Sequence, residues 1–135
     1  MFQEDWVMRQ IESIVDFLTV AILGKKSARM ENHDIQKESG DGSMDRLSLQ
    51  LVRMIREKRL HEAENLLFDQ MKPRDEQSLA AAVDFYSRLN LLDDKTLESC
   101  HFSRAEISDG LRRASGMFGI SLGVLFPPAQ GEKDG

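Results

Sequence analysis

Residues 4–23, EDWVMRQIESIVDFLTVAIL, carry apolar side chains three or four positions apart, which is the spacing of one helical face. The residues on that face are Val7, Ile11, Ile14, Val15, Leu18 and Ile22. The stretch therefore predicts an amphipathic helix. Its second half, residues 17–23, is apolar around more of the circumference than one buried face requires. This half is expected to be either deeply packed or shared with another subunit.

The sequence after this helix predicts a break in the chain. Gly24 is a typical helix stop, and Lys25 and Lys26 suit the negative end of the helix dipole. Residues 31–43 are polar and glycine-bearing, without a sustained period, which is typical of a linker. We therefore expect an N-terminal helix over residues 1–24 and a flexible linker over 25–43.

Residues 44–120 predict a helical body. Apolar residues recur on helical faces at Met44, Leu47, Leu51, Val52 and Ile55, at Leu60, Ala63, Leu66, Leu67 and Met71, and at Leu79, Ala82, Val83, Tyr86 and Leu89. The first two groups predict a helical hairpin, and the third predicts a helix after Pro73.

Polar residues at helix starts support these boundaries. Asp75 can cap the third helix of the body, and Asp93 or Asp94 can cap a short helix through Leu97. The segment Ser103-Arg104-Ala105-Glu106 is a capping box and predicts the final helix, with Ile107 and Leu111 pointing inward. Residues 121–135 mix apolar residues with helix breakers and end in a polar stretch, so we expect a disordered tail.

The composition favours one all-α domain. The chain has 135 residues, of which 41% are hydrophobic, 30% charged and 7% aromatic. A chain of this length and composition can bury a core, and few aromatic residues and prolines favour helix over strand. No sheet is expected.

Charge and cysteine content exclude several classes of function. A net charge of -5 opposes binding to nucleic acid. The single cysteine, Cys100, cannot form an internal disulfide, and Glu4 and Asp5 stand where a signal peptide needs positive charge. Residues 17–23 are too short to span a membrane. We expect a cytoplasmic protein that binds neither membranes nor nucleic acid.

Two patterns near residue 100 suggest chemistry. Cys100 and His101 could pair as nucleophile and base, but adjacent helical residues point about 100° apart. Glu98 and His101 have the spacing of a metal-binding helix face, yet such sites need a second copy and further glutamates. The segment His61-Glu62-Ala63-Glu64 has the opposite order, because His61 comes three residues before Glu64, and His33 falls in the predicted linker. We expect an ordinary half-buried cysteine and solvated side chains.

The remaining candidates also have structural explanations. Two basic clusters could bind an anion: Lys25, Lys26 and Arg29, and Arg53, Arg56, Lys58 and Arg59. Cations are favoured at helix ends, and Glu57, Glu62 and Glu64 are available as partners. Trp6 and the seven methionines could form a binding surface, but methionine at helical spacing is typical of a core. Gly110, Gly116, Gly119 and Gly123 form no phosphate loop and are expected to interrupt helices. No catalytic, cofactor-binding or metal-binding residue is assigned.

Glu62-Ala63 followed by Leu66-Leu67 resembles the second helix of a tetratricopeptide repeat, although Lys58 stands where a turn glycine is typical and residues 76–100 fit poorly. Residues 1–12, 62–68, 84–90 and 101–111 resemble a family of small bacterial proteins of uncharacterised function. The resemblance covers most of residues 1–120. It implies a tetratricopeptide-like fold in a bacterial cytoplasm, and it supplies no activity, cofactor or catalytic residue.

Three function classes follow from these observations. The first is a non-enzymatic protein-interaction module built from stacked helical hairpins. The second is a structural homo-oligomer, possible as a dimer, that assembles through the helix over residues 4–23. The third and least favoured is an enzyme or metal protein that uses Glu98, Cys100 and His101. The expected partner is therefore another protein or a second copy of this chain.

Overall fold

The computed structural model describes residues 2–32, 43–123 and 125–127, and within them it contains helices and no strand. The helices are α1 (Phe2–Asn32), α2 (Ser43–Arg56), α3 (Leu60–Gln70), α4 (Glu76–Asn90), α5 (Asp94–Ser99) and α6 (Arg104–Phe118). The predicted all-α fold class is confirmed. In this part of the chain, no helix combines the length and the apolarity needed to cross a bilayer.

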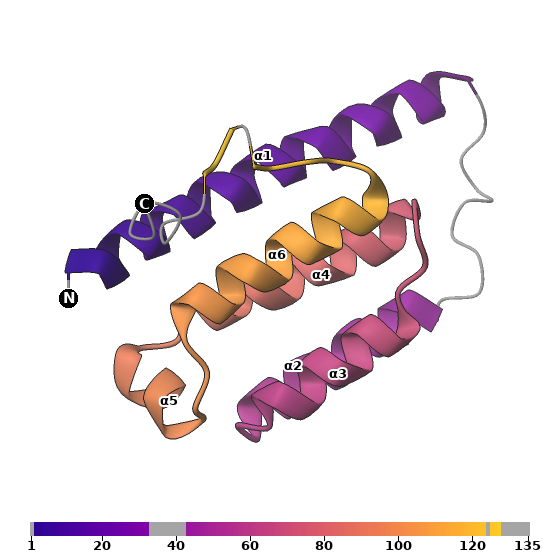
Figure 1. Cartoon of the computed structure of the whole chain (residues 1–135). Helices are drawn as coiled ribbons and strands as arrows, with labels where there is room; N and C mark the ends of the chain where they lie inside the picture. The colour runs from indigo at the N-terminus through magenta and orange to yellow at the C-terminus, as the bar shows by residue number, and fades with distance from the viewer. Residues whose placement is uncertain (1, 33–42, 124, 128–135) are drawn as a thin grey trace.

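The helices form three layers, with α4 in the middle (Figure 1). Helix α1 lies along one side of α4 and α6, the hairpin of α2 and α3 lies on the other side, and α5 lies at one end. Helix α4 contacts α1, α2, α3 and α6. Its buried apolar residues are Leu79, Ala81, Ala82, Val83, Phe85, Tyr86 and Leu89. Most of its surface is thus removed from water, which makes α4 the centre of the hydrophobic core.

The predicted inward faces agree with the burial of their side chains, except at Val52, which is half-buried and is not part of the core cluster or of the apolar residues packed against it. In α1, Ile11, Ile14 and Leu18 are fully buried, and Val7, Val15 and Ile22 pack partly against the core. The buried residues predicted in the body include Leu47, Leu51, Leu60, Ala63, Leu67, Met71, Leu79, Ala82, Leu89, Ile107 and Leu111. The side chain of Met44 lies outside the described residues.

The predicted caps are also present. The side chain of Asp75 accepts a hydrogen bond from Ser78 N at 2.9 Å. Of the two candidates for α5, Asp93 is the cap and accepts from Thr96 N at 2.8 Å. Ser103 and Glu106 form both hydrogen bonds of the capping box, each at 3.1 Å. These bonds satisfy backbone amides that lack a partner inside the helix, which is why the short sequence signals locate the helix starts.

Arg104 joins three helices in a way that the sequence did not reveal. Its side chain is 6% exposed, and its guanidinium donates to the backbone oxygen and Oδ1 of Asn90, to Leu92 O and to Asp94 Oδ1. Asn90 Nδ2 donates in turn to Met8 O of α1 at 3.4 Å. Arg104 therefore holds the end of α4, the start of α5 and the start of α6 together.

The predicted helix end at Gly24 is wrong, because α1 continues to Asn32. Gly24 has a helical backbone here, and a glycine inside a helix costs only about 1 kcal/mol, which the helix-forming residues around it can offset. Residues 25–32 therefore belong to α1 rather than to the predicted linker over 25–43, and residue 43 begins α2. Residues 33–42 lie outside the described part of the chain.

The prediction of a disordered tail is wrong for the residues described between 121 and 127. Leu122 is 3% exposed, the ring of Phe126 lies edge-on to Phe17 at 6.0 Å, and Gln10 Nε2 donates to Pro127 O at 3.0 Å. Leu122 is buried in the core and Phe126 contacts Phe17 of α1, and these are long-range contacts that local composition does not reveal. Residues 124 and 128–135 lie outside the described residues.

The predicted role of the glycines is only partly correct. Gly110 and Gly116 lie inside α6 and do not interrupt it. Gly119 does end the helix, because its φ of +107° is a backbone conformation that only glycine adopts without strain.

Candidate functional site

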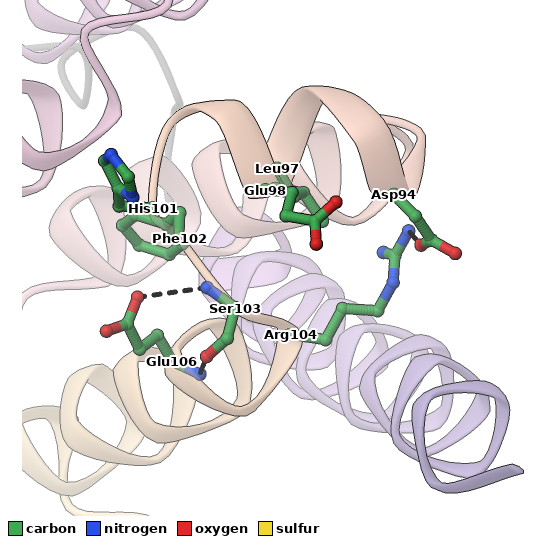
Figure 2. A pocket seen from close by; sticks show the side chains of 8 residues that line it. All are labelled: Asp94, Leu97, Glu98, His101, Phe102, Ser103, Arg104 and Glu106. Carbon is green, nitrogen blue, oxygen red and sulfur yellow. Dashed lines mark hydrogen bonds and ion pairs between the residues drawn. The ribbon is translucent and has the colours of Figure 1, made fainter. Parts of the chain in front are cut away.

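A hollow of about 340 Å³ lies where α5 meets α6 (Figure 2). It is lined by Asp94, Leu97, Glu98, His101, Phe102, Ser103, Arg104 and Glu106. Glu98 and His101, two of the residues singled out for chemistry in the sequence, therefore reach the same hollow. Cys100 does not line it.

The geometry at this hollow does not pair the residues considered for catalysis. His101 lies beyond the end of α5 and has a φ of +56°. Its ring and the Glu98 carboxylate point away from each other (Figure 2). The thiol of Cys100, half-buried at the end of α5 as expected, donates to Lys58 O at 3.6 Å. Neither the Cys100 and His101 pair nor the Glu98 and His101 pair is brought into contact.

The other polar groups of the hollow hold the helices together. Arg104 donates to the end of α4 and to Asp94, and Glu106 caps α6 through Ser103. Beside the hollow, His61 Nε2 lies 2.8 Å from His101 O, and the His61 ring is tilted by 40° against the Phe102 ring, with the ring centroids 4.8 Å apart. Across residues 2–32, 43–123 and 125–127, no three His, Cys, Asp or Glu side chains are grouped so that they could hold a metal ion. This hollow is best explained as a structural junction.

A different surface feature extends along the exposed side of α4, and we call it the α4 furrow. It consists of three adjoining hollows of about 300, 350 and 290 Å³. The first lies between α1 and α4, and the other two lie between α2 and α4. Asp84 lines both the first and the second hollow, and Val52 and Arg88 line both the second and the third. Neighbouring hollows therefore share lining residues along α4.

The walls of the α4 furrow are mainly apolar. Ile22 and Leu23 line it on α1, Val52 and Ile55 on α2, and Leu91 follows α4 at the far end. Leu23, Leu49 and Leu91 are 57%, 72% and 78% exposed. Exposed large apolar side chains that gather along one hollow are typical of binding surfaces, whereas single ones are common everywhere.

The α4 furrow has a neutral ion pair in its floor and opposite charges at the two ends of its α2 wall. In its floor, Arg88 Nε donates to Asp84 Oδ2 at 2.8 Å, so this pair adds no net charge. Asp45 lines the middle hollow in the first turn of α2, and Arg56 lines the last hollow in the last turn of α2. The α2 wall is therefore acidic at one end and basic at the other.

Most of the other sequence candidates have structural roles. Arg59 pairs with Glu57 at 2.9 Å and with Glu62 at 2.6 Å, and these hydrogen bonds, above all the one to Glu62, raise its pKa. Met54 and Met71 are buried in the core, whereas Trp6 is 48% exposed. The side chains of Lys25, Lys26 and Arg29, and all of His33, lie outside the described residues.

Leu49 and Leu91 are not among the candidate residues predicted from the sequence. A signal for Leu49 was present, because it lies two residues from both Leu47 and Leu51 and therefore on the opposite side of α2 from the core. No comparable signal marked Leu91, which follows the last turn of α4.

The described residues thus define an all-α protein with an apolar furrow along its central helix. The chain matches the model of a family described as "Family of unknown function (DUF6483)" over residues 1–119, and it belongs to that family. Neither the curated proteins nor the solved structures include a significant match. The resemblance to a family of unknown function is confirmed, whereas its bacterial origin stays a prediction.

Proposed function

We propose that this chain is a non-enzymatic protein-interaction module that binds a helix of its partner in the α4 furrow. The observation that carries the proposal is the coincidence of three adjoining hollows with the exposed side chains of Leu23, Leu49 and Leu91. From Ala80 to Leu91 the furrow follows about three helical turns, or about 16 Å. A partner helix of similar length can place one apolar side chain in each hollow.

Selection from a displayed library of amphipathic helical peptides tests the proposal with defined probes. We expect enrichment of peptides whose apolar residues recur every three or four positions, because that spacing matches successive hollows. Leu49→Glu and Leu91→Glu should each weaken binding of a selected peptide by at least about tenfold, because each buries a charge in the contact.

Leu125→Glu is the matched control, because Leu125 is also exposed, at 56%, but lies in the segment after α6 and does not line the furrow. This variant should bind the selected peptides as the unmodified chain does. No enrichment of helical peptides, or equal loss of binding in Leu125→Glu, would contradict the proposal.

A second candidate function is self-assembly through α1. It is supported by Val20 and Leu23, which are 68% and 57% exposed on the stretch whose excess apolar character the sequence revealed. An apparent mass in sedimentation that rises with protein concentration, and no longer rises in Val20→Glu, would support this alternative. An apparent mass that Val20→Glu leaves unchanged would argue against it.

The proposal retains two further expectations from the sequence. One is a tetratricopeptide-like stacking of hairpins, supported by the short connection between α2 and α3 and by the packing of both helices on α4. The other is the cytoplasm as the compartment, supported by a sequence with a single cysteine.

A further inference from the structure

The exposed edge of α2 carries a stripe of four residues at helical spacing: Asp45, Leu49, Val52 and Arg56. Intervals of four, three and four residues keep them on one side of the helix. All four line the α4 furrow. Asp45 and Arg56 are exposed, and within the described part of the chain neither forms an ion pair.

This stripe is complementary to itself when it is reversed. Asp45 and Arg56 lie equally far from the midpoint of the stripe, and so do Leu49 and Val52. An antiparallel copy of α2 therefore places its Arg56 opposite Asp45 and its Val52 opposite Leu49. A two-fold axis repeats each contact, which is the property of an isologous interface.

The charges alone would not require a contact between copies. Asp45 in the first turn and Arg56 in the last turn also suit the dipole of α2 itself. Leu49 has no such explanation, because it is 72% exposed between them, beside a hollow whose floor is neutralised by Asp84 and Arg88. A helix laid over this stripe covers Leu49 and brings opposite charges together at both ends.

We propose that the partner helix in the α4 furrow is α2 of a second copy of this chain, packed antiparallel around a two-fold axis. The proposal rests on the proposed function and names the occupant of the same site. Each copy places its Leu49 in the hollow between α2 and α4 of the other. Because the stripe spans only about 16 Å, the buried area lies at the low end of specific interfaces, and we expect a dimer with a dissociation constant in the range of about 1–100 μM.

Sedimentation equilibrium of the full chain with charge-reversal variants tests the pairing. The unmodified chain should dimerise, and Asp45→Arg and Arg56→Asp should each weaken dimerisation by at least about tenfold, because each creates two like-charge contacts. An equimolar mixture of the two variants should form mixed dimers, since every contact is then between opposite charges. The double variant Asp45→Arg with Arg56→Asp should dimerise with itself for the same reason.

Several results would overturn this proposal. They are a monomeric unmodified chain at concentrations up to about 1 mM, single variants that dimerise normally, a mixture that stays monomeric, or loss of the dimer on Val20→Glu instead. All these substitutions replace exposed side chains, and circular dichroism verifies that each variant is folded. If the chain is monomeric but binds helical peptides in a Leu49-dependent manner, the second-copy proposal fails while the proposed function stands. If the charge exchange behaves as expected, the second copy is the partner.

Discussion

Gly110 lets the ring of Tyr86 lie directly against the backbone of α6. A Cβ atom at this position would lie 2.2 Å from both Cζ and Oη of Tyr86. Tyr86 is fully buried and its hydroxyl donates to Glu64 Oε2 of α3 at 2.5 Å, so the ring cannot move aside without breaking that bond. Gly110 thus permits one tyrosine to join α3, α4 and α6.

Gly110→Ala should therefore destabilise the fold by about 2–3 kcal/mol, as overpacking in a core does, despite the higher helix propensity of alanine. Gly116→Ala is the matched control in the same helix, because nothing lies within 4 Å of a Cβ built there. It should stabilise by about 0.5–1 kcal/mol. Urea unfolding of both variants measures the difference, and equal effects would contradict the close approach of Tyr86.

The burial of the Tyr86 hydroxyl makes the free energy of unfolding depend on pH. Its burial, and secondly its hydrogen bond to Glu64, raise its pKa well above the ordinary value of 10.0. The unfolded chain therefore loses this proton near pH 10 while the folded chain keeps it. The contribution of Tyr86 is complete below pH 10, and each pH unit above that value should remove about 1.4 kcal/mol of stability.

Because the chain contains one tyrosine, its tyrosinate absorbance reports on Tyr86 alone. Tyrosinate absorbance should appear only together with the loss of helical circular dichroism. The excess loss of stability above pH 10 should be absent in Tyr86→Phe, which separates Tyr86 from the lysines that titrate in the same range. Tyrosinate absorbance in a chain that is still helical would contradict the proposed burial and hydrogen bond.

At the scale of the elements, most helices could be predicted because their signals are local. The capping residues Asp75, Asp93 and Ser103 bond to amides three residues away, so sequence spacing determines them almost completely. The end of α1 is different. Gly24 is compatible with either a helix end or a continued helix. The sequence predicted a helix end there, whereas α1 continues.

Gly24→Ala distinguishes these two conformations. If α1 continues through residue 24, alanine should stabilise the chain by about 0.5–1 kcal/mol, since no atom lies within 4 Å of a Cβ built there. If the helix stopped at a left-handed glycine, alanine would instead cost about 1 kcal/mol. Thermal unfolding of the variant gives the sign directly.

At the scale of the whole molecule, the segment after α6 packs against the core. Leu122 is 3% exposed, and the neighbouring Phe126 contacts Phe17 of α1. Leu122→Ala should lower the free energy of unfolding by about 2–3 kcal/mol, as for other buried leucines.

Leu125→Ala provides the control for this prediction, because Leu125 lies in the same segment but is 56% exposed. Its effect should stay within about 0.5 kcal/mol. Chemical denaturation compares the two variants. A Leu122→Ala variant as stable as Leu125→Ala would mean that Leu122 does not pack in the core.

The α4 furrow also belongs to the scale of the whole molecule. Its walls come from α1, α2 and α4, and residues such as Leu23, Asp45 and Leu91 are far apart in the sequence. No motif joins them, so the sequence alone could not predict the site. The motif-like residues that the sequence did offer, Cys100 and His101, lie at a helix end where they do not meet.

The sequence by itself determined the all-α class, the buried faces and the helix starts, because periodicity and capping act over three or four residues. Only the tertiary structure decided that Arg104 joins three helices, that the segment around Leu122 is packed, and that the exposed side of α4 forms a furrow. These features depend on which helix faces meet, and that is set by packing between distant segments, for which the local pattern of residues carries no signal.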